Sequence, residues 1–514
     1  MKKALALIFL SAGCLFVSTE SPAQTFRYAN DALRFSQYQP GGTARIMSLG
    51  GAQVALGGDI SSAYSNPAGL GFYNRSEISF TPSFTNSVND AYFIAPGESV
   101  SSNSLYDYRS RLGIGSLGVV LNRSKKSEDR SGWLGGSFAI TYQRTNTFYD
   151  KFAFEGNNAS NSLVDIFPLY ELNTYNNLDL QGFYGAALDA ELIAIFEDTE
   201  VNGEARYYYD TYMPFPDEEF PIFQRDVVQT AGSQGQLNFA YGGNIADMVY
   251  IGGGIGITSL SYTYNSRYQE VVPQGLYTTY PEQIDEYPLS RLDLDTERVT
   301  SGAGINATLG IIARPIPAIS LGLSYQTPTL YQMNEEEAGT FDTQFESGTP
   351  RGFGSYYNSF DYNLKTPGRV TAGLAAFIEK WGFLTADVEY VNYGNARLTD
   401  SYSSLTSDNN AIRQDLEAVI NYRLGAELRY EVLRFRAGYA HQPNPYANRV
   451  GFEAISNVYS VGAGLRFRQY YVDLALNQQR NNRLYTPYDL GPDSPRISLD
   501  NKVSSAFLTV GLTF

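Results

Sequence analysis

The feature that most constrains the fold of this chain is a strict alternation of apolar and polar residues. It is clearest between Val419 and Tyr430. One set of positions there holds Ile420, Tyr422, Leu424, Ala426, Leu428 and Tyr430, and the intervening set holds Asn421, Arg423, Gly425, Glu427 and Arg429. A repeat of two residues is the period of a β-strand, whose side chains point alternately to opposite faces of a sheet. The alternation recurs at 433–439, 459–467 and 506–514, so we predict an all-β fold.

The chemistry of the two faces indicates where such strands fold. In a soluble sandwich the polar face would meet water and the apolar face would meet a second sheet. In an outer-membrane barrel the apolar face meets lipid, and arginine and glutamate line a wet or plugged lumen. Tyr (41 residues) and Phe (30) are abundant while Trp is rare (2), and apolar content is ordinary, as expected when only one strand face meets lipid. These observations favour a transmembrane barrel.

Counting the alternating segments gives fourteen predicted antiparallel strands. Short connections follow most even strands and long polar ones follow the odd strands from the third onwards, which is typical of the two rims of an outer-membrane barrel. One connection, 123–132, breaks this rule. The predicted strands lie near 77–88, 106–122, 133–148, 227–244, 248–264, 299–313, 319–331, 360–378, 382–393, 418–430, 433–441, 458–468, 470–479 and 503–514.

The long connections carry two further predictions. The largest, 149–226, is too long to lack structure of its own, and the helical spacing of Leu188, Leu192, Ile195 and Phe196 predicts a short helix over 185–199. A second helix is predicted at 409–416. The acidic run Glu335–Glu337 falls in a predicted loop, and we interpret it as a solvated tip.

The first residues have the organisation of a secretory signal. Lys2 and Lys3 precede an apolar run at 4–17, and small residues before Ala23 suit cleavage after that residue. The alternative is lipid attachment at Cys14. We expect a cleaved signal peptide at 1–23, a hatch at 24–75 and a barrel at 76–514. Cleavage would remove Cys14, the one cysteine of the chain, and so exclude disulfides and thiol chemistry.

Charge and histidine content limit the possible functions. The formal net charge of −16 argues against a nucleic-acid partner. With no other cysteine and one histidine, His441, we expect no metal site, no cofactor and no catalytic residues. The glycine runs at 252–256 and 302–305 lie inside alternating segments, so close contact between strands explains them better than nucleotide binding does.

The stretch 41–73 stands apart because it is rich in small residues and lies directly before the first predicted strand. Two glycine pairs, Gly50-Gly51 and Gly57-Gly58, are predicted to act as hinges. Asn66-Pro67-Ala68, followed by Gly69, reads as a helix start, with Asn66 as the N-cap and Pro67 at the first helical position. We predict that this segment forms a hatch inside the barrel.

With these features together, the chain resembles the FadL-type family of outer-membrane transporters for long-chain fatty acids and other hydrophobic molecules. The resemblance rests on 45–72, including Asn66-Pro67-Ala68, followed by fourteen strands that end in Phe514. It implies capture of a ligand at the outer loops, passage gated by the hatch, and lateral exit into the membrane through a kink in the third strand. Gly135 and Gly136 are the candidate kink residues.

The resemblance also implies partners and a location. The chain is expected in the outer membrane of a Gram-negative bacterium, in contact with lipid and lipopolysaccharide, with Phe514 as a signal for the barrel assembly machinery. Arg423 and Arg436 are possible lumen contacts for a ligand headgroup. The ligand remains open among a fatty acid, an aromatic hydrocarbon and haem.

Two alternatives remain open. Barrels of this type also resemble the shuttle component of the type IX secretion system, whose outer loops hold a protein substrate. A lipid-modifying enzyme would need a Ser–His pair on neighbouring wall strands, and His441 is the one histidine available for it.

Overall fold

The structure of the protein is a computed structural model. It describes residues 22–39, 41–96, 104–124, 132–167, 182–201, 204–211, 216, 219–273, 289–345, 352–400, 405–447 and 454–514. The predicted signal peptide falls almost wholly outside these ranges, so its cleavage stays a prediction.

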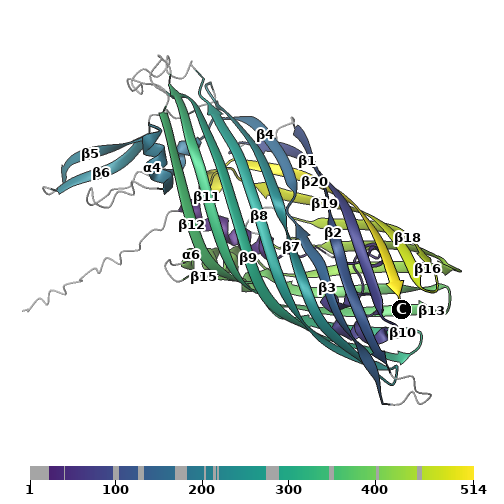
Figure 1. Cartoon of the computed structure of the whole chain (residues 1–514). Helices are drawn as coiled ribbons and strands as arrows, with labels where there is room; N and C mark the ends of the chain where they lie inside the picture. Colours follow the sequence, from purple (N-terminus) through teal and green to yellow (C-terminus); the bar gives the residue numbers. More distant parts are fainter. Residues whose placement is uncertain are drawn as a thin grey trace, which may run out of the picture.

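The described strands form a closed antiparallel barrel (Figure 1). Eighteen segments form one sheet, and β20 pairs with β1 to close it. They build fourteen wall strands because four wall strands consist of two segments each: β3 with β4, β10 with β11, β12 with β13, and β14 with β15. The predicted fourteen-stranded barrel is thereby confirmed. The segments are β1 (Glu77–Ile94), β2 (Ser104–Ser124), β3 (Trp133–Thr147), β4 (Asp150–Asn158), β7 (Ile222–Ile245), β8 (Val249–Val271), β9 (Leu289–Ile316), β10 (Ile319–Gln326), β11 (Leu330–Phe345), β12 (Gly352–Lys365), β13 (Arg369–Ile378), β14 (Gly382–Asn392), β15 (Arg397–Thr399), β16 (Ala418–Tyr430), β17 (Leu433–Gln442), β18 (Ser456–Arg466), β19 (Tyr470–Tyr485) and β20 (Arg496–Thr513).

The outer surface of the barrel is apolar around its whole circumference. Large apolar side chains are exposed on each of the fourteen wall strands, where a soluble protein would bury them. One example from each strand, in chain order, is Ile78, Leu117, Ile140, Phe239, Ile255, Leu309, Leu323, Leu374, Leu384, Leu424, Phe435, Val461, Leu474 and Leu508. This belt is the lipid-facing surface that the alternation predicted.

Several strands continue far beyond the length that a membrane requires. β9 has 28 residues and β7 has 24, whereas a tilted transmembrane strand needs about 9–11. Figure 1 shows β7, β8, β9, β11 and β12 rising past the rest of the wall. The predicted loops 265–298 and 332–359 are therefore wrong in extent, since the long strands occupy much of them. Glu335 lies inside β11, buried and paired with β9 and β12, so the solvated-tip interpretation of this run is also wrong.

The raised part of the wall surrounds an apolar core of buried side chains, and we refer to this region as the outer chamber. Short helices from the largest connection, η2 (Leu163–Ile166) and α4 (Gly182–Asp189), pack there against β4 and the long strands. The predicted helix over 185–199 is wrong in its second half. Glu191 adopts a left-handed conformation (φ 54°), and the chain continues as the hairpin of β5 (Ile193–Val201) and β6 (Glu204–Thr211), which projects beyond the rim (Figure 1).

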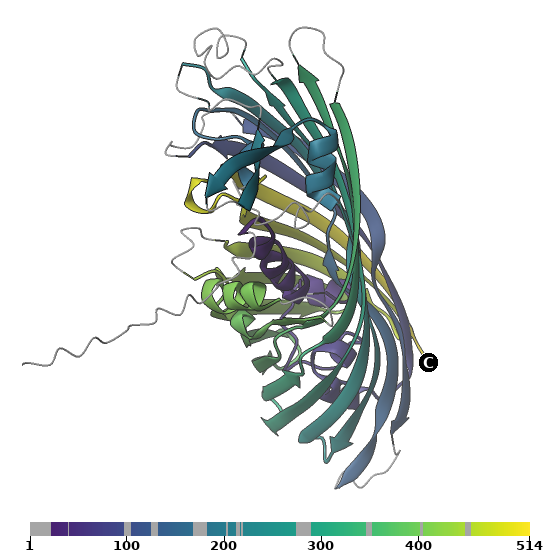
Figure 2. The same ribbon diagram turned by 90° about the vertical axis from the view of Figure 1, so that its left-hand side faces the viewer.

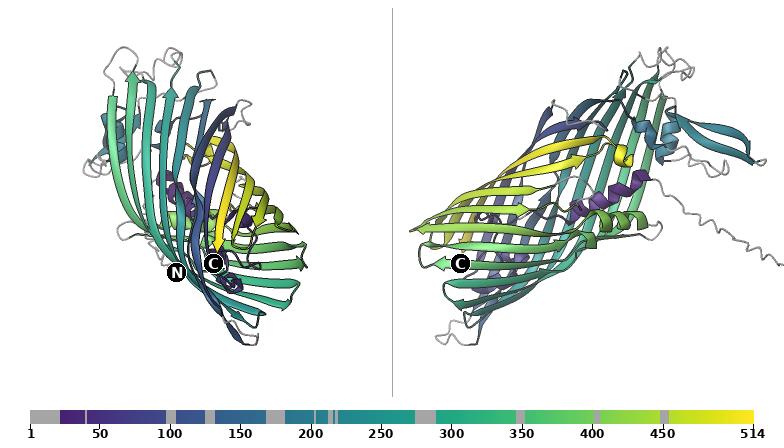
Figure 3. Two further views of the ribbon diagram at one scale, coloured as in Figure 1. Left: turned by 45° about the vertical axis from the view of Figure 1, so that its right-hand side comes forward. Right: turned by 180° about the vertical axis from the view of Figure 1, so that it is seen from behind.

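The leading segment lies inside the barrel. α1 (Pro22–Ser36) runs through the lumen beside α6 (Thr406–Asp415), as Figures 2 and 3 show, and the two share an apolar cluster with the inner wall. The chain continues towards the end of the barrel at which short turns join the strands. It forms three short helices there: α2 (Ala44–Met47), α3 (Ser62–Ser65) and η1 (Pro67–Phe72). The helix predicted at 409–416 corresponds to α6. The remaining short helices are η6 (Tyr393–Asn395) and η8 (Gly491–Asp493).

None of the helices in the described ranges has the length and apolarity needed to cross a membrane.

Candidate functional site

The hatch is a compact run of turns rather than a regular domain. Gly50, Gly51, Gly57 and Gly58 all have φ between 63° and 82°, the left-handed region that glycine enters without steric cost. Their role as hinges stays a prediction. The part of the hatch from Thr43 to Tyr73, which we call the hatch body, is cross-linked internally, because the Thr43 hydroxyl donates to the Asp59 carboxylate at 2.8 Å.

The Asn66-Pro67-Ala68-Gly69 motif joins the hatch to the wall. Asn66 caps η1, its side-chain oxygen accepting from the Ala68 amide at 3.2 Å, and Pro67 occupies the first position. The Asn66 amide donates to the Val54 carbonyl at 2.8 Å and to the Ile311 carbonyl of β9 at 3.3 Å. One side chain thus caps a helix and bonds both hatch and wall.

A belt of wall glycines forms the seat of the hatch. At each of them an added Cβ would press on hatch atoms, so the wall backbone lies directly against the hatch. The nearest hatch atoms are side-chain atoms of Asn66 at Gly310 and of Ser48 at Gly462, and include backbone atoms at the other six. On β8, for example, a side chain at Gly252 would meet the backbone of Pro67 and Ala68. We call these residues the hatch seat: Gly242, Gly252, Gly310, Gly322, Gly373, Gly425, Gly438 and Gly462, on eight wall strands.

The seat is reinforced by a buried carboxylate on β14. Asp387 is 1% exposed and accepts from the Gln53 and Val54 amides at 2.7 and 3.0 Å. Charge-assisted bonds of this kind are stronger than neutral ones. The hatch body is therefore held by contacts that are both close and charged.

Below the seat lies a paired ion network that contains Arg436. Its guanidinium is 2.7 Å from Glu427 and 2.7 Å from Asp473. Glu427 also pairs with Arg429, and Asp473 with Arg466. Arg45 of the hatch adds a further cation 3.9 Å from Glu427; burial works to lower its pKa, but Glu427 and Asp59 raise that pKa above its ordinary value.

Arg423, the other predicted ligand contact, is paired in the same way. It lies 2.9 Å from Glu389, which is also 3.9 Å from Arg369. Arg369 in turn covers the ring of Tyr38 at 3.9 Å. The structure therefore gives Arg423 and Arg436 carboxylate partners next to the hatch and does not bring them together, and their contact with a ligand stays a prediction.

The third wall strand is interrupted at two places. At the start of β3 its register against β7 shifts between Trp133 and Gly135, and Gly135 has φ 109°. Gly136 packs against the Gly242 carbonyl and the Tyr241 ring. The second interruption begins with a shift between Arg144 and Asn146 and ends where β4 starts at Asp150. β3 pairs with both β2 and β7, whereas β4 pairs with β7 alone.

Beyond the second interruption, β4 leans inward over the inner face of β1. The buried Ser87 and Asn89 side chains of β1 donate to the Asp150 carboxylate at 2.8 and 2.6 Å, and Asn89 also donates to the Lys151 carbonyl at 2.7 Å. The edge of β2 above Gly115 consequently lacks a backbone ladder towards β4. We call this unladdered line between β2 and β4 the seam.

The seam adjoins the segment that connects α1 to the hatch body. We call this segment, Gln37–Gln39 and Gly41–Gly42, the linker. The Gln39 amide donates to the Thr145 carbonyl at 2.9 Å, and the Asn146 side chain donates to the Gln37 carbonyl at 3.2 Å. Thr145, which the register shift skips, and the neighbouring Asn146 thus hold the linker in place.

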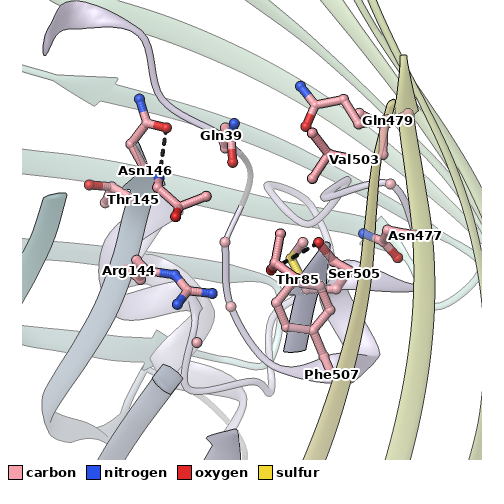
Figure 4. A pocket seen from close by; sticks show the side chains of 17 residues that line it. Gln39, Thr85, Arg144, Thr145, Asn146, Asn477, Gln479, Val503, Ser505 and Phe507 are labelled. Atoms are coloured by element: carbon pink, nitrogen blue, oxygen red, sulfur yellow. Dashed lines mark hydrogen bonds between the residues drawn. The ribbon is translucent and has the colours of Figure 1, made fainter. Parts of the chain in front are cut away.

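A cavity lies between the linker and the wall (Figure 4). In Figure 4 Arg144 stands on one side of it, and Thr85, Ser505 and Phe507 stand on the other. The cavity measures about 60 Å³, room for a handful of water molecules. A hydrophobic ligand would therefore have to displace the linker or widen the seam in order to occupy it.

His441 lies near the outer end of β17. Its Nδ1 is 2.9 Å from the Asn457 side-chain oxygen, which also accepts from the Tyr439 hydroxyl at 2.8 Å. Within the described ranges no group of three or more histidine, cysteine, aspartate or glutamate side chains is placed to hold a metal ion.

Sequence reasoning missed the second interruption and β4. Phe152 and Phe154, two residues apart, were a strand signal inside the predicted loop 149–226, and both side chains are buried. The hatch seat was also missed. Close contact between strands was predicted at 252–256, whereas Gly252 lies against the backbone of Pro67 and Ala68 in the hatch.

A closed barrel with an apolar outer belt and an internal hatch defines the class of this protein as an outer-membrane barrel. Its fold is of the FadL type. The chain is similar to the crystal structure of a Pseudomonas aeruginosa FadL homologue, with a TM-score of 0.52 at 12% identity over 92% of this chain and 99% of the other. It is also similar to the P. putida toluene transporter TodX (TM-score 0.49, 12% identity, 93% and 99% covered). Neither protein-family models nor curated proteins give a match to the sequence.

Proposed function

We propose that the protein carries hydrophobic small molecules across the outer membrane of a Gram-negative cell, with capture in the outer chamber and lateral exit through the seam. The observation that carries the proposal is the cavity beside the linker, which adjoins a line of the wall where β2 and β4 lack backbone pairing. Solved structures of similar fold are described as a FadL homologue and as a toluene transporter.

The outer chamber supplies the driving force for capture. Its apolar cluster includes Phe93, Phe154 and Phe341 from three wall strands and Ala186 from α4. Burial of apolar ligand surface there gains roughly 25 cal/mol per Å². Transport in this scheme needs no covalent chemistry and no cofactor.

We assign gating to the N-terminal segment inside the barrel. Within that segment, the linker is the part that moves, and the hatch body stays in place. The body is seated on wall glycines and on Asp387, whereas the linker is held by hydrogen bonds to the interrupted strand and by the buried Tyr38 side chain, which bonds Thr329 and lies under Arg369. Displacing the linker would join the cavity to the seam without unseating the body. A ligand such as a long-chain fatty acid could then leave sideways into the bilayer.

The test is to fill the cavity. Ser505→Trp places a large side chain in it, and we expect the uptake of dodecanoate by vesicles containing the purified barrel to fall about tenfold or more. Ser504→Trp is the matched control, because Ser504 is exposed on the opposite face of β20. Equal uptake by the two variants would contradict the proposed path.

A protein-binding function is the second candidate. The β5–β6 hairpin projects beyond the rim, where it could meet a protein substrate of a secretion system (Figure 1). Recovery of a stoichiometric protein partner with the native barrel, together with unchanged uptake in Ser505→Trp, would favour this function over transport.

A further inference from the structure

β12 forms one margin of the raised wall and has an edge without a neighbouring strand (Figure 1). On one side it pairs with β11 along its whole length, from Gly352 to Lys365. On the other side it pairs with β15, and only over Asn363–Lys365. Within the described ranges no strand lies beside 352–362 on that side. Such an edge presents backbone N–H and C=O groups in a row, with which another chain can pair.

This open edge lies beyond the lipid-facing belt. On the outer face of β8 the apolar residues of the belt end at Ile257, and Ser259 follows. Tyr357 of β12 is level with Asn265 of β8 in the registers of the intervening strands. At about 3.3 Å per residue, Tyr357 therefore lies roughly 25 Å past Ile257 along the wall. The Tyr357 side chain is 61% exposed and that of Phe353 is 58% exposed, at a height where lipid does not cover them.

The sequence of this edge lacks the features that usually prevent strand pairing. Natural sheets shield exposed edges with charged residues, with proline or with very short strands. The stretch 352–360, GFGSYYNSF, contains no charged residue and no proline, and β12 has 14 residues. By contrast, β4 carries Lys151 and Glu155, and both strands of the β5–β6 hairpin carry acidic residues. The edge of β12 is therefore suited to accept a further strand.

The outer face of the wall beside this edge is acidic. Asp295 and Glu297 of β9 and Glu336 of β11 are exposed on it. Arg267 and Arg291 each pair with an aspartate of β9. In the described part of the chain Glu297 and Glu336 form no ion pair, so the face has an excess of negative charge. A strand that carries lysine or arginine on its outer face would be attracted to it.

The inner side of the same edge is covered by α4. Gly352 and Gly354 of β12 approach this helix so closely that an added Cβ would collide with the carbonyl oxygens of Ala190 and Ala186. The helix lies over β12 much more than over β11. A strand added beyond β12 would therefore pass beside α4, and its inward side chains would have to be small.

We propose that the edge of β12 between Phe353 and Asp361 binds an extended segment of a partner protein, which adds an antiparallel strand to the raised wall. The segment carries basic and aromatic residues on its outer face, opposite the acidic wall and the exposed rings, and small residues on its inner face. This site goes beyond the proposed transport function and does not depend on it.

A second copy of the chain does not fit this edge. Barrels in one membrane are inserted in the same direction, so their β12 strands run the same way and cannot form an antiparallel pair with each other. A parallel pair is less stable per residue. An extended segment of another protein can approach in the antiparallel direction.

The test uses a synthetic peptide of about ten residues that alternates Lys or Phe with Ala. Its binding to the purified full-length barrel is measured by fluorescence anisotropy in an uncharged detergent at low salt. We expect saturable binding, and we expect amides between 353 and 361 to exchange hydrogen for deuterium about tenfold more slowly when the peptide is bound. Only alternate amides of this stretch should gain protection, because alternate residues direct their backbone groups to the open edge.

A second peptide tests whether backbone pairing carries the binding. It has the same side chains, but amides on both of its edges are methylated and cannot donate hydrogen bonds. We expect its affinity for the wild-type barrel to be lower by about tenfold or more.

Two variants with the same added charge test the location of the site. Tyr357→Lys places a cation at the edge, where it repels the lysines of the peptide, and should weaken binding by about tenfold. Asn265→Lys places a cation on the same outer face but three strands away, and should change binding little. Glu336→Gln should weaken binding by about twofold to fivefold and reduce its dependence on salt.

Several results would overturn the proposal. They are the absence of peptide binding, equal binding of the methylated peptide, and unchanged exchange at every amide between 353 and 361. Equal binding by Tyr357→Lys and Asn265→Lys would overturn it too. A dimer of the peptide-free barrel that dissociates in Tyr357→Lys would assign the edge to a second copy instead. None of these results affects the transport proposal, because the edge and the seam lie on different strands.

Discussion

The hatch body and the seam meet the barrel wall in opposite ways. At the hatch seat, wall glycines on eight strands lie directly against hatch atoms, and Arg436 below it is paired with carboxylates. At the seam, β2 and β4 share no backbone ladder, and side chains alone cross the line between them: Arg109 and Arg111 donate to β7 carbonyls, and Lys151 of β4 pairs with Asp107 of β2 at 2.8 Å. One region is built to stay closed and the other to exchange its contacts.

This difference locates the moving part of the molecule. Unseating the hatch body would break close packing and buried charged hydrogen bonds at the same time, whereas opening the seam breaks a few hydrogen bonds and the partly exposed ion pair of Lys151 with Asp107. Since local opening begins where buried contacts are few, the linker and the seam should open before the seat does.

The largest expected effect comes from breaking the ion network below the seat. Arg436→Met leaves Glu427 and Asp473 each without one cation, and we expect the free energy of unfolding to fall by about 3–5 kcal/mol. Urea unfolding in vesicles, followed by the fluorescence of Trp133 and Trp381, measures it. Arg434→Met is the control, because Arg434 bonds only backbone carbonyls at the exposed turn, and it should change little. Similar losses of unfolding free energy in both variants would contradict the claim that the ion pairs of Arg436 stabilise the barrel below the hatch seat.

A smaller effect is expected from adding side chains at the seat. Gly252→Val presses on the backbone of Pro67 and Ala68, and overpacking of this kind costs about 1–3 kcal/mol. The displaced hatch should admit large polar antibiotics into cells that carry the variant. Gly253→Val lies one residue away on the outer face, where the nearest atom is the flexible end of Leu309 at 3.2 Å, and it should not leak. Leakage through both variants would show that the glycines do not define a seat.

The smallest effect on stability belongs to the linker. Gln39→Pro removes the amide that bonds Thr145, a loss of about 0.5–1.5 kcal/mol, and should raise the uptake rate of dodecanoate because the linker moves aside more readily. Gln39→Ala keeps that amide and should behave as the wild type does. Slower uptake in Gln39→Pro would indicate that the linker guides the ligand instead of blocking it.

The barrel could be predicted from the sequence because the patterns that specify it involve residues close together in the chain. Alternation along each strand and the lengths of the connections specify the number of strands and the lipid-facing side, and Asn66-Pro67 specifies a helix start. The seam could not be predicted in the same way. It depends on which strand β4 pairs with, and on Arg109 and Arg111 of β2 reaching carbonyls more than a hundred residues away on β7.

Interior arginines illustrate the same limit. Arg423 and Arg436 are conspicuous because they alternate with apolar residues, and the structure pairs both of them with carboxylates from neighbouring strands. Arg109 and Arg111 alternate in the same manner at 105–112. Only the register between strands distinguishes an arginine with an acidic neighbour from one without.

Hydrogen–deuterium exchange of the full-length barrel, with and without dodecanoate, tests most directly the claim that the hatch body stays seated while the linker and seam open. The account predicts that the amides of Gln53 and Val54 remain protected in both conditions. It also predicts that the amides of Gln39 and Phe148, which bond Thr145 and Gly232, exchange faster when the acid is present. Loss of protection at Gln53 and Val54, with Gln39 and Phe148 unchanged, would contradict it.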